Sequence, residues 1–196
     1  MSLAIVKYNA GNICSVINAL HRLGVEPVVT DNPTVLQSAD HVIFPGQGEA
    51  SSAMAYLRER GLDTVIKSLT KPVLGICVGQ QLLCRHSDEG NVDCLGIFST
   101  DVHRFLPQPG YKVPAMGWNR IETTKDVPLT AGLGDSPFVY FVHSYYCPLC
   151  DDTIATADYT LPFSAAMQRD NFFATQFHPE KSGTVGEAIL RNFLSL

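Results

Sequence analysis

Cys77 lies in a pattern that can carry nucleophilic chemistry. Gly75-x-Cys77-x-Gly79 is the cysteine version of the G-x-S-x-G nucleophile elbow, in which glycines let a strand turn sharply into a helix. The apolar residues 72–76 predict a buried strand, and a helix that begins after the cysteine favours a thiolate and can stabilise an oxyanion. We predict that Cys77 is a nucleophile presented to solvent at this turn. The alternative is a small, buried cysteine without a chemical role.

His178 and Glu180 are of the types that such a nucleophile needs. They are two residues apart at the end of a predicted strand, so in an extended chain they project to the same side. The carboxylate can then hold the imidazole, which can take the proton of Cys77 and later give it to a leaving amine. The alternative is a surface histidine beside a solvated glutamate.

The loop of residues 45–48, Pro-Gly-Gln-Gly, is another candidate site. It follows a predicted strand, and glycines at the carboxyl end of a parallel strand free backbone N–H groups to point into the crevice where ligands bind. We expect an oxyanion hole beside the cysteine, formed by Gly46, Gln47 and Gly48 together with Val78 at the start of the next helix. The alternative for the loop is an ordinary turn.

The elements of the first half must position these groups. Apolar runs predict strands over residues 3–6, 27–30, 41–44 and 72–76, and helical spacing predicts helices over 13–23, near 35–39 and over 50–69. Strand and helix alternate in this order, which is typical of an open, mostly parallel sheet flanked by helices. The predicted fold class is therefore α/β.

The second half has a different pattern, in which short apolar runs are broken by Gly, Pro and Asp. These runs predict mostly antiparallel strands over residues 95–98, 102–106, 118–122, 138–146, 154–157, 164–168 and 172–177. Several should extend or face the parallel sheet, and a last helix over 185–194 closes the fold. We see no repeat or linker and expect a single domain over residues 1–196.

The composition limits the possible functions. The chain has 196 residues, of which 45% are hydrophobic and 17% charged, and this suits a compact domain with a substantial core. A net charge of −5 argues against a general nucleic-acid or anionic-membrane binder. The start of the chain does not resemble a signal peptide and no apolar run is long enough to span a membrane, so we expect a cytosolic protein.

The six cysteines are expected to be free thiols, because a cytosolic chain of this size does not need a disulfide framework. Cys147 and Cys150 form a single C-x-x-C pattern without a second ligand pair or a thioredoxin-like context. This pattern is weak support for zinc or for redox chemistry. We expect no metal and no cofactor.

Three motifs in this order resemble the triad glutamine amidotransferases: Pro-Gly-x-Gly at residue 45, Gly-Ile-Cys-x-Gly-x-Gln at residue 75 and Phe-His-Pro-Glu at residue 177. The resemblance implies a flavodoxin-like, class I amidotransferase fold, with Cys77 as nucleophile, His178 as general base and acid, and Glu180 as its orienting partner. It also implies that Gln81 contacts the substrate glutamine. In that family the thiolate attacks the side-chain amide, ammonia leaves, and water resolves a glutamyl thioester to glutamate.

Later motifs resemble a branch of this family, the glutaminase subunits of imidazole glycerol phosphate synthase in histidine biosynthesis. They are Val-Pro-x-Met-Gly-Trp-Asn at residue 113, Tyr-Phe-Val-His-Ser-Tyr-Tyr at residue 140 and His-Pro-Glu-Lys-Ser-Gly at residue 178. The resemblance implies a heterodimer in which ammonia passes into a separate cyclase subunit, a (β/α)8 barrel. It assigns Asn12, Trp118 and Lys181 to the interface with that partner.

Some of these residues also have other interpretations. By residue type alone, Trp118 is better explained as a core aromatic that caps a turn, and Lys181 as a solvated side chain. The backbone of His143, Ser144 and Tyr145, at a strand end, is expected to bind the α-carboxylate and amine of glutamine. A role for His143 as a second base is less well supported, because no carboxylate is adjacent to it in the sequence.

Three positions depart from the usual pattern of these subunits. Gln47 replaces a small apolar residue, Gln80 a frequent methionine, and Ala115 an expected histidine. None is a member of the triad, but Gln47 leaves the conformation of the oxyanion loop open. We expect low activity without the synthase partner. The alternatives are a glutaminase that serves another synthase and a non-catalytic regulator with the same fold.

Overall fold

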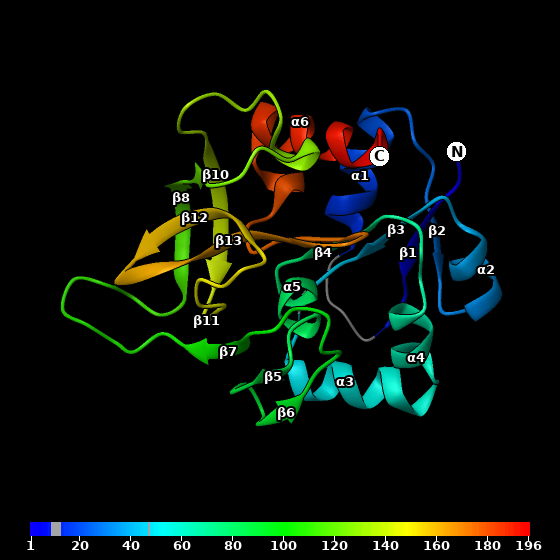
Figure 1. The fold of residues 1–196 in the computed structure, drawn as a ribbon, viewed down its shortest axis with the longest axis horizontal. Coiled ribbons are helices and arrows are strands. Elements are labelled where there is room, and N and C mark those ends of the chain that lie inside the picture. The colour runs from blue at the N-terminus through cyan, green and yellow to red at the C-terminus, as the bar shows by residue number, and fades with distance from the viewer. Residues whose placement is uncertain (9–12, 47) are drawn as a thin grey trace.

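The main sheet has eight strands in the computed structural model, which describes residues 1–8, 13–46 and 48–196 (Figure 1). Strands β2, β1, β3, β4 and β14 run parallel in that order, and β13, β12 and β9 continue the sheet by antiparallel pairing. In sheet order the bounds are Val28–Thr30 (β2), Leu3–Val6 (β1), His41–Phe44 (β3), Val73–Ile76 (β4), Phe172–Thr175 (β14), Leu161–Arg169 (β13), Thr153–Tyr159 (β12) and Glu122–Thr123 (β9).

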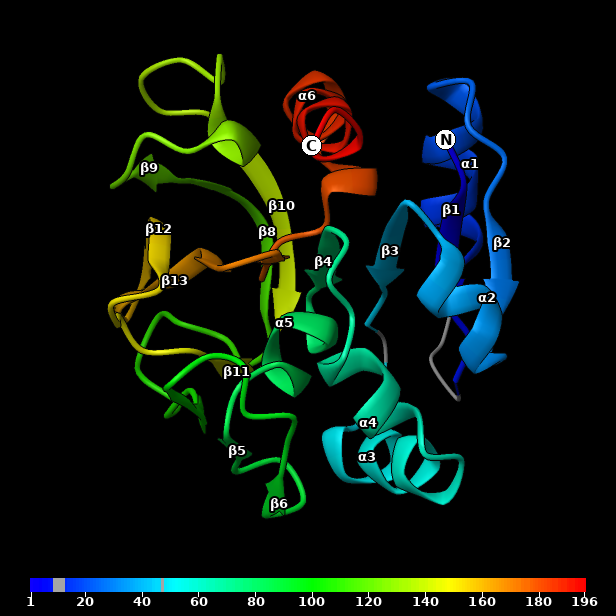
Figure 2. The same cartoon turned by 45° about the vertical axis from the view of Figure 1, so that its right-hand side comes forward.

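Helices cover both faces of this sheet (Figure 2). α1 (Cys14–Arg22) and α6 (Gly183–Leu194) lie on one side, and α3 (Ala50–Glu59), α4 (Leu62–Lys67) and α5 (Val78–Leu82) lie on the other. The remaining helical segments are α2 (Pro33–Ser38) and two 3-10 turns, η1 (Pro128–Thr130) and η2 (Pro179–Lys181).

Two smaller sheets flank the main one. An antiparallel pair joins β8 (Ala115–Arg120) to β10 (Phe138–His143). The other small sheet contains, in order, β11 (Tyr145–Tyr146), β7 (Asp101–Arg104), β5 (His86–Ser87) and β6 (Val92–Asp93). In Figure 1, β8 and β10 lie to the left of β4, and β5, β6 and β7 lie below α5.

The central strands are buried over their whole length. β1, β3, β4 and β14 have no exposed position, because helices or neighbouring strands cover both faces of the sheet. This burial explains why they appear in the sequence as continuous apolar runs and not as alternating patterns. The predicted α/β fold, an open and mostly parallel sheet with antiparallel strands in the C-terminal half, is confirmed.

The strand predicted over residues 95–98 is wrong. Leu95 N donates to the Leu82 carbonyl, and both Ile97 N and Phe98 N donate to the Leu83 carbonyl, so this segment closes the end of α5. The last carbonyls of a helix have no partner within the helix, and here an apolar loop satisfies them. Its buried hydrophobic side chains produced the strand-like pattern.

Two further details differ from expectation. The helical region predicted over residues 50–69 is two helices, because Gly61 adopts φ +65° between them. β14 lies in the half expected to be mostly antiparallel, yet it pairs in parallel with β4, as β5 does with β7. Among the described residues, no helix is both long and apolar enough to cross a membrane.

Candidate active site

Cys77 forms the sharp turn between β4 and α5. Its backbone angles, φ of 54° and ψ of −108°, are outside the regions that residues other than glycine normally adopt, as the nucleophile-elbow pattern predicts. The turn depends on Gly79, where a Cβ would stand 2.1 Å from the Phe44 carbonyl oxygen. It depends equally on Gly46, where a Cβ would stand 2.3 Å from the backbone nitrogen of Gly79. Glycine at these positions lets the loop after β3 pack directly on the start of α5.

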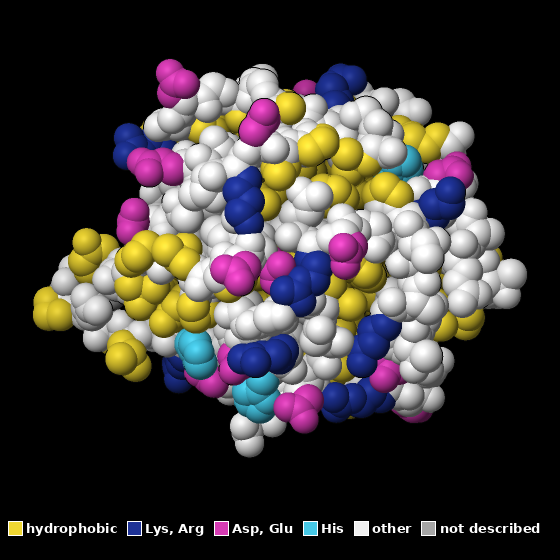
Figure 3. Space-filling view, in the orientation of Figure 1, with side chains coloured by type: hydrophobic (Ala, Val, Ile, Leu, Met, Phe, Trp, Pro, Cys, Tyr) yellow, Lys and Arg dark blue, Asp and Glu magenta, His cyan; other side chains and the backbone are white. Residues whose placement is uncertain are grey.

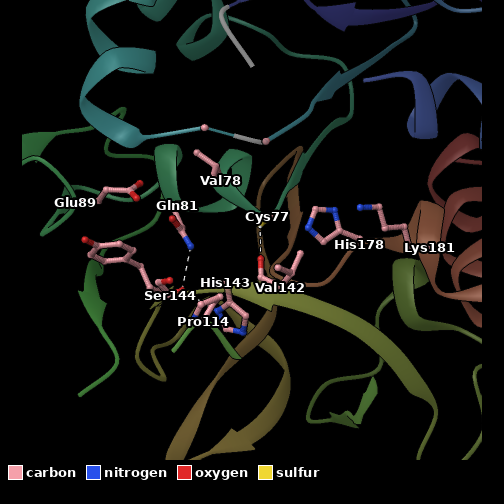
Figure 4. A pocket seen from close by; sticks show the side chains of 13 residues that line it. Cys77, Val78, Gln81, Glu89, Pro114, Val142, His143, Ser144, His178 and Lys181 are labelled. Carbon is pink, nitrogen blue, oxygen red and sulfur yellow. Dashed lines mark hydrogen bonds between the residues drawn. The ribbon is translucent and has the colours of Figure 1, made fainter. Parts of the chain in front are cut away.

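Cys77 is buried, contrary to the prediction that it is presented to solvent; only 5% of its surface is exposed. β10 crosses the elbow, and the Val142 carbonyl lies 3.8 Å from Sγ (Figure 4). The sulfur instead faces a cavity of about 440 Å³, a size typical of small-molecule sites. The cavity is lined by Gly46, Gly48, Cys77, Val78, Gln81, Glu89, Pro114, Val142, His143, Ser144, Tyr145, His178 and Lys181.

His178 and Glu180 form the predicted carboxylate–imidazole pair. Nδ1 of His178 lies 2.8 Å from Oε1 of Glu180, and both side chains are almost fully buried, so the surface alternative is wrong. The backbone of His178 is fixed as well: its N–H donates to the Tyr140 carbonyl, and the Ser182 hydroxyl donates to its carbonyl. This leaves Nε2 as the ring nitrogen that is not held by the carboxylate.

The two histidines of the cavity have opposite electrostatics. Burial alone would lower the pKa of His178, but its interactions with Cys77 and Glu180 outweigh burial and raise the pKa to about 10. Burial lowers the pKa of His143 to about 4, against a hydrogen bond to the Tyr145 carbonyl that raises it. His178 is therefore suited to carry a proton and His143 to remain neutral at pH 7.

His143 and Gln81 meet at one carbonyl on the cavity wall. Nδ1 of His143 lies 2.8 Å from the Tyr145 oxygen, and Nε2 of Gln81 donates to the same oxygen at 3.1 Å. A carbonyl can only accept, so His143 carries its proton on Nδ1. This arrangement fixes the turn from His143 through Ser144 to Tyr145, whose backbone was expected to bind substrate.

Two residues beside the nucleophile or on the cavity wall were not predicted from the sequence: Gln176, next to Cys77, and Glu89, which lines the cavity. Gln176 is fully buried, and its Nε2 lies 3.7 Å from Cys77 Sγ. Its alternation with His178 and Glu180 was an available signal, because in an extended chain the three would share a side. In the structure β14 ends at Thr175 and Glu180 stands in the 3-10 turn η2, yet Gln176 still lies beside the nucleophile. Glu89 has no such signal: its carboxylate accepts from Ala50 N in a loop, and partial burial raises its pKa.

Two of the three residues assigned to a partner surface, Trp118 and Lys181, lie in the described part of the chain. Trp118 is 56% exposed on β8, so its interpretation as a core aromatic is wrong. Met116 and Phe138 on the same strand pair are also exposed, and Figure 3 shows further hydrophobic side chains on the loop between β7 and β8. Lys181 lines the cavity, and the Trp118 ring approaches the start of α6 two residues further on. Asn12, like Gln47 of the oxyanion loop, lies outside the described residues.

The C-x-x-C cysteines are not arranged as a metal site. Across residues 1–8, 13–46 and 48–196, no three His, Cys, Asp or Glu side chains are placed to hold a metal ion. Cys147 instead packs its sulfur 3.5 Å from that of Cys84, and burial raises the pKa of the Cys84 thiol. Both are buried thiols behind the active-site helix.

The fold and the site define a known class of protein. Residues 5–196 match the family described as glutamine amidotransferase class-I, so the chain belongs to this family of enzymes. The structure also superimposes on a solved glutamine amidotransferase with a TM-score of 0.74 at 20% sequence identity, covering 98% of this chain and 97% of the other.

Within that class, the chain belongs to the HisH family. It is 61% identical to imidazole glycerol phosphate synthase subunit HisH of Bacteroides thetaiotaomicron and 46% identical to the subunit of the same name from Escherichia coli. Each alignment covers 100% of both chains.

Proposed function

We propose that this chain hydrolyses glutamine to glutamate and ammonia through Cys77, His178 and Glu180, and delivers the ammonia to a cyclase subunit of imidazole glycerol phosphate synthase. The main support is one observation: the Cys77 sulfur and the imidazole of a buried His178–Glu180 pair face the same cavity. The names of the HisH relatives support the synthase complex and its pathway.

In the first half of the reaction, the Cys77 thiolate attacks the side-chain carbonyl carbon of glutamine. The oxyanion that forms accepts hydrogen bonds from backbone N–H groups of the loop after β3 and of Val78, which stands in the first turn of α5 and has no acceptor within the helix. Protonated His178 gives its proton to the amide nitrogen, the C–N bond breaks, and ammonia leaves a glutamyl thioester on the sulfur.

In the second half, water replaces ammonia. Neutral His178 takes a proton from a water molecule, which attacks the thioester carbonyl and releases glutamate with the sulfur restored as thiolate. Glu180 holds the imidazole by Nδ1, so Nε2 faces the reacting groups in both steps, and the carboxylate stabilises each imidazolium that forms. The balance is glutamine and water to glutamate and ammonia.

The far end of the cavity suits the charged groups of the amino acid. Glu89, Ser144 and Tyr145 all line the cavity. The Glu89 carboxylate would pair with the α-amine, and the backbone of Ser144 and Tyr145 would bind the α-carboxylate. In Figure 4 Gln81 lies between Glu89 and Cys77, and its amide donates to the Tyr145 carbonyl. From this position Gln81 would contact the side chain of the substrate. The substrate would then bind to the same turn that His143 and Gln81 hold in place.

The partner surface is the exposed apolar face of β8 and β10. Met116, Trp118 and Phe138 are large, exposed hydrophobic residues on the strand pair that also carries the cavity residues Val142 and His143, and such clusters mark protein–protein contacts. The motif resemblance supports a (β/α)8-barrel cyclase as the partner. Ammonia released at Cys77 would leave past Lys181 into that subunit.

A direct test is glutamate release from glutamine by the purified chain, alone and with the cyclase subunit and its ribotide ligand. We expect low activity alone, strong stimulation by the cyclase complex, and no activity in Cys77→Ala. If the cyclase does not change the activity, the proposed hydrolysis of glutamine stands but the proposed delivery of ammonia to the cyclase is rejected. Activity that survives in Cys77→Ala would reject the chemistry.

A further inference from the structure

Gln176 lies beside the nucleophile because of the strand pairing beneath it. β14 and β4 run parallel with Thr175 opposite Ile76, so the next residue of each strand, Gln176 and Cys77, leaves the sheet at the same point. Cys77 N donates to the Thr175 carbonyl at 2.7 Å, which extends the pairing to the elbow itself. The Gln176 side chain is fully buried, with Nε2 3.7 Å from Cys77 Sγ, a hydrogen-bond distance for the large sulfur atom.

A chain of hydrogen bonds fixes which end of the Gln176 amide meets the sulfur. The chain begins at the Tyr145 carbonyl, which can only accept, so the Gln81 atom 3.1 Å from it is the Nε2 donor. The same Nε2 lies 3.0 Å from Gln176 Oε1 and donates its other proton there. Gln176 therefore presents its N–H group, and not its carbonyl, to Cys77.

We propose that Gln176 donates a hydrogen bond to the nucleophile: its Nε2–H stabilises the Cys77 thiolate, while its Oε1 holds Gln81 in place for the substrate. The inference rests on the proposed role of Cys77 as nucleophile. A hydrogen bond to the charged form of a group favours that form. The Val142 carbonyl, 3.8 Å from the same sulfur, can only accept and so interacts with the thiol. Gln176 is the neutral donor that favours the opposite, reactive state.

Two substitutions separate the two ends of this amide. Gln176→Glu is nearly isosteric and keeps an oxygen to accept from Gln81, but its carboxylate cannot donate to the sulfur. Gln176→Met keeps the approximate length and removes both interactions. Gln80→Met is the matched control, because Gln80 is an equally buried glutamine on α5 whose amide donates to the Ser164 carbonyl.

The deciding measurement is the rate of Cys77 alkylation by iodoacetamide as a function of pH, followed on the Cys77 peptide by mass spectrometry. We expect the midpoint of the profile to rise by about one pH unit or more in Gln176→Glu, by about half a unit in Gln176→Met, and not at all in Gln80→Met. An unchanged midpoint in folded Gln176→Glu would overturn the proposal. Circular dichroism verifies folding, and Gln176→Glu decides the question if Gln176→Met does not fold.

Steady-state kinetics with the cyclase complex supply a second readout. We expect Gln176→Glu to lower kcat by about tenfold or more with KM nearly unchanged, because the Gln81 contact remains. Gln176→Met should lower kcat and also raise KM. Equal KM and kcat effects in the two variants would contradict the separate roles of the two amide ends. The alkylation assay needs neither glutamine nor a partner, so failure of the proposed synthase function would leave its result interpretable.

Discussion

At the scale of single residues, the site depends on buried polar contacts that each have one geometry. The His178–Glu180 pair has a nitrogen–oxygen distance of 2.8 Å and almost no exposure to water, so solvent cannot replace either partner. The neutral His143 and the amide of Gln81 share one acceptor. Loss of any of these partners leaves a buried polar group unpaired.

Glu180→Gln tests the orienting role of the carboxylate. We expect kcat to fall roughly 10²- to 10⁴-fold with KM within about threefold, because the amide no longer stabilises the imidazolium or fixes its tautomer. The pKa of His178, measured by NMR titration, should fall from about 10 towards its ordinary range. The control is Glu187→Gln on α6, which removes an exposed ion pair with Arg22 of α1 and should retain full activity. Near-normal turnover in Glu180→Gln would exclude the carboxylate from the mechanism.

The buried His143 makes stability depend on pH. Its folded pKa of about 4 is below the unfolded value of 6.5, so between these pH values the unfolded chain binds a proton that the folded chain does not. The free energy of unfolding therefore falls as pH falls through this window, by about 2 kcal/mol from pH 8 to pH 5 for this group. His143→Phe should show a correspondingly smaller pH dependence in urea unfolding. Equal slopes for the variant and the unchanged protein would refute the assignment.

At the scale of elements, the features that could be predicted from the sequence are those with a local pattern. The central strands are continuous apolar runs, and the elbow, the histidine loop and the glycine loop each have a short motif at a strand end. Features that depend on non-local contacts could not be predicted: residues 95–98 pack on the end of α5, and β10 buries Cys77 from a distant part of the chain. Gln176 was not predicted, although its spacing from His178 is the one that would put both side chains on one side of an extended chain.

The packing of α5 on the loop after β3 gives a prediction for Gly79. Gly79→Ala would place a methyl group 2.1 Å from the Phe44 carbonyl oxygen, so the helix must move away from β3. We expect a loss of about 3 kcal/mol in the free energy of unfolding. Gly24→Ala is the control: its φ of +78° is strained for alanine but the space is open, so the loss should be about 1–2 kcal/mol. Equal losses would mean that the close approach is not needed.

At the scale of the whole molecule, the strand pair β8–β10 carries both cavity residues, Val142 and His143, and the exposed Trp118, so the proposed partner surface would lie close to the proposed catalytic site. Trp118→Ala should raise the Kd for the cyclase roughly 30-fold, since an exposed tryptophan at such a surface is a typical energetic anchor. The thermal unfolding midpoint of the isolated chain should barely change. Val28→Ala, an exposed apolar residue on β2 at the opposite end of the sheet, should leave the Kd unchanged in calorimetry. An unchanged Kd in Trp118→Ala would show that the cyclase does not bind at this surface.

The most direct test of the central claim is covalent labelling by a glutamine-mimicking electrophile, read as the mass of the intact chain and of its cysteine peptides. We expect one adduct, on Cys77, that forms faster with the cyclase and its ligand, is blocked by excess glutamine, and is absent in Cys77→Ala. Labelling of Cys77→Ala at the normal rate, or labelling that glutamine does not prevent, would contradict the proposal that Cys77 is the glutamine-directed nucleophile.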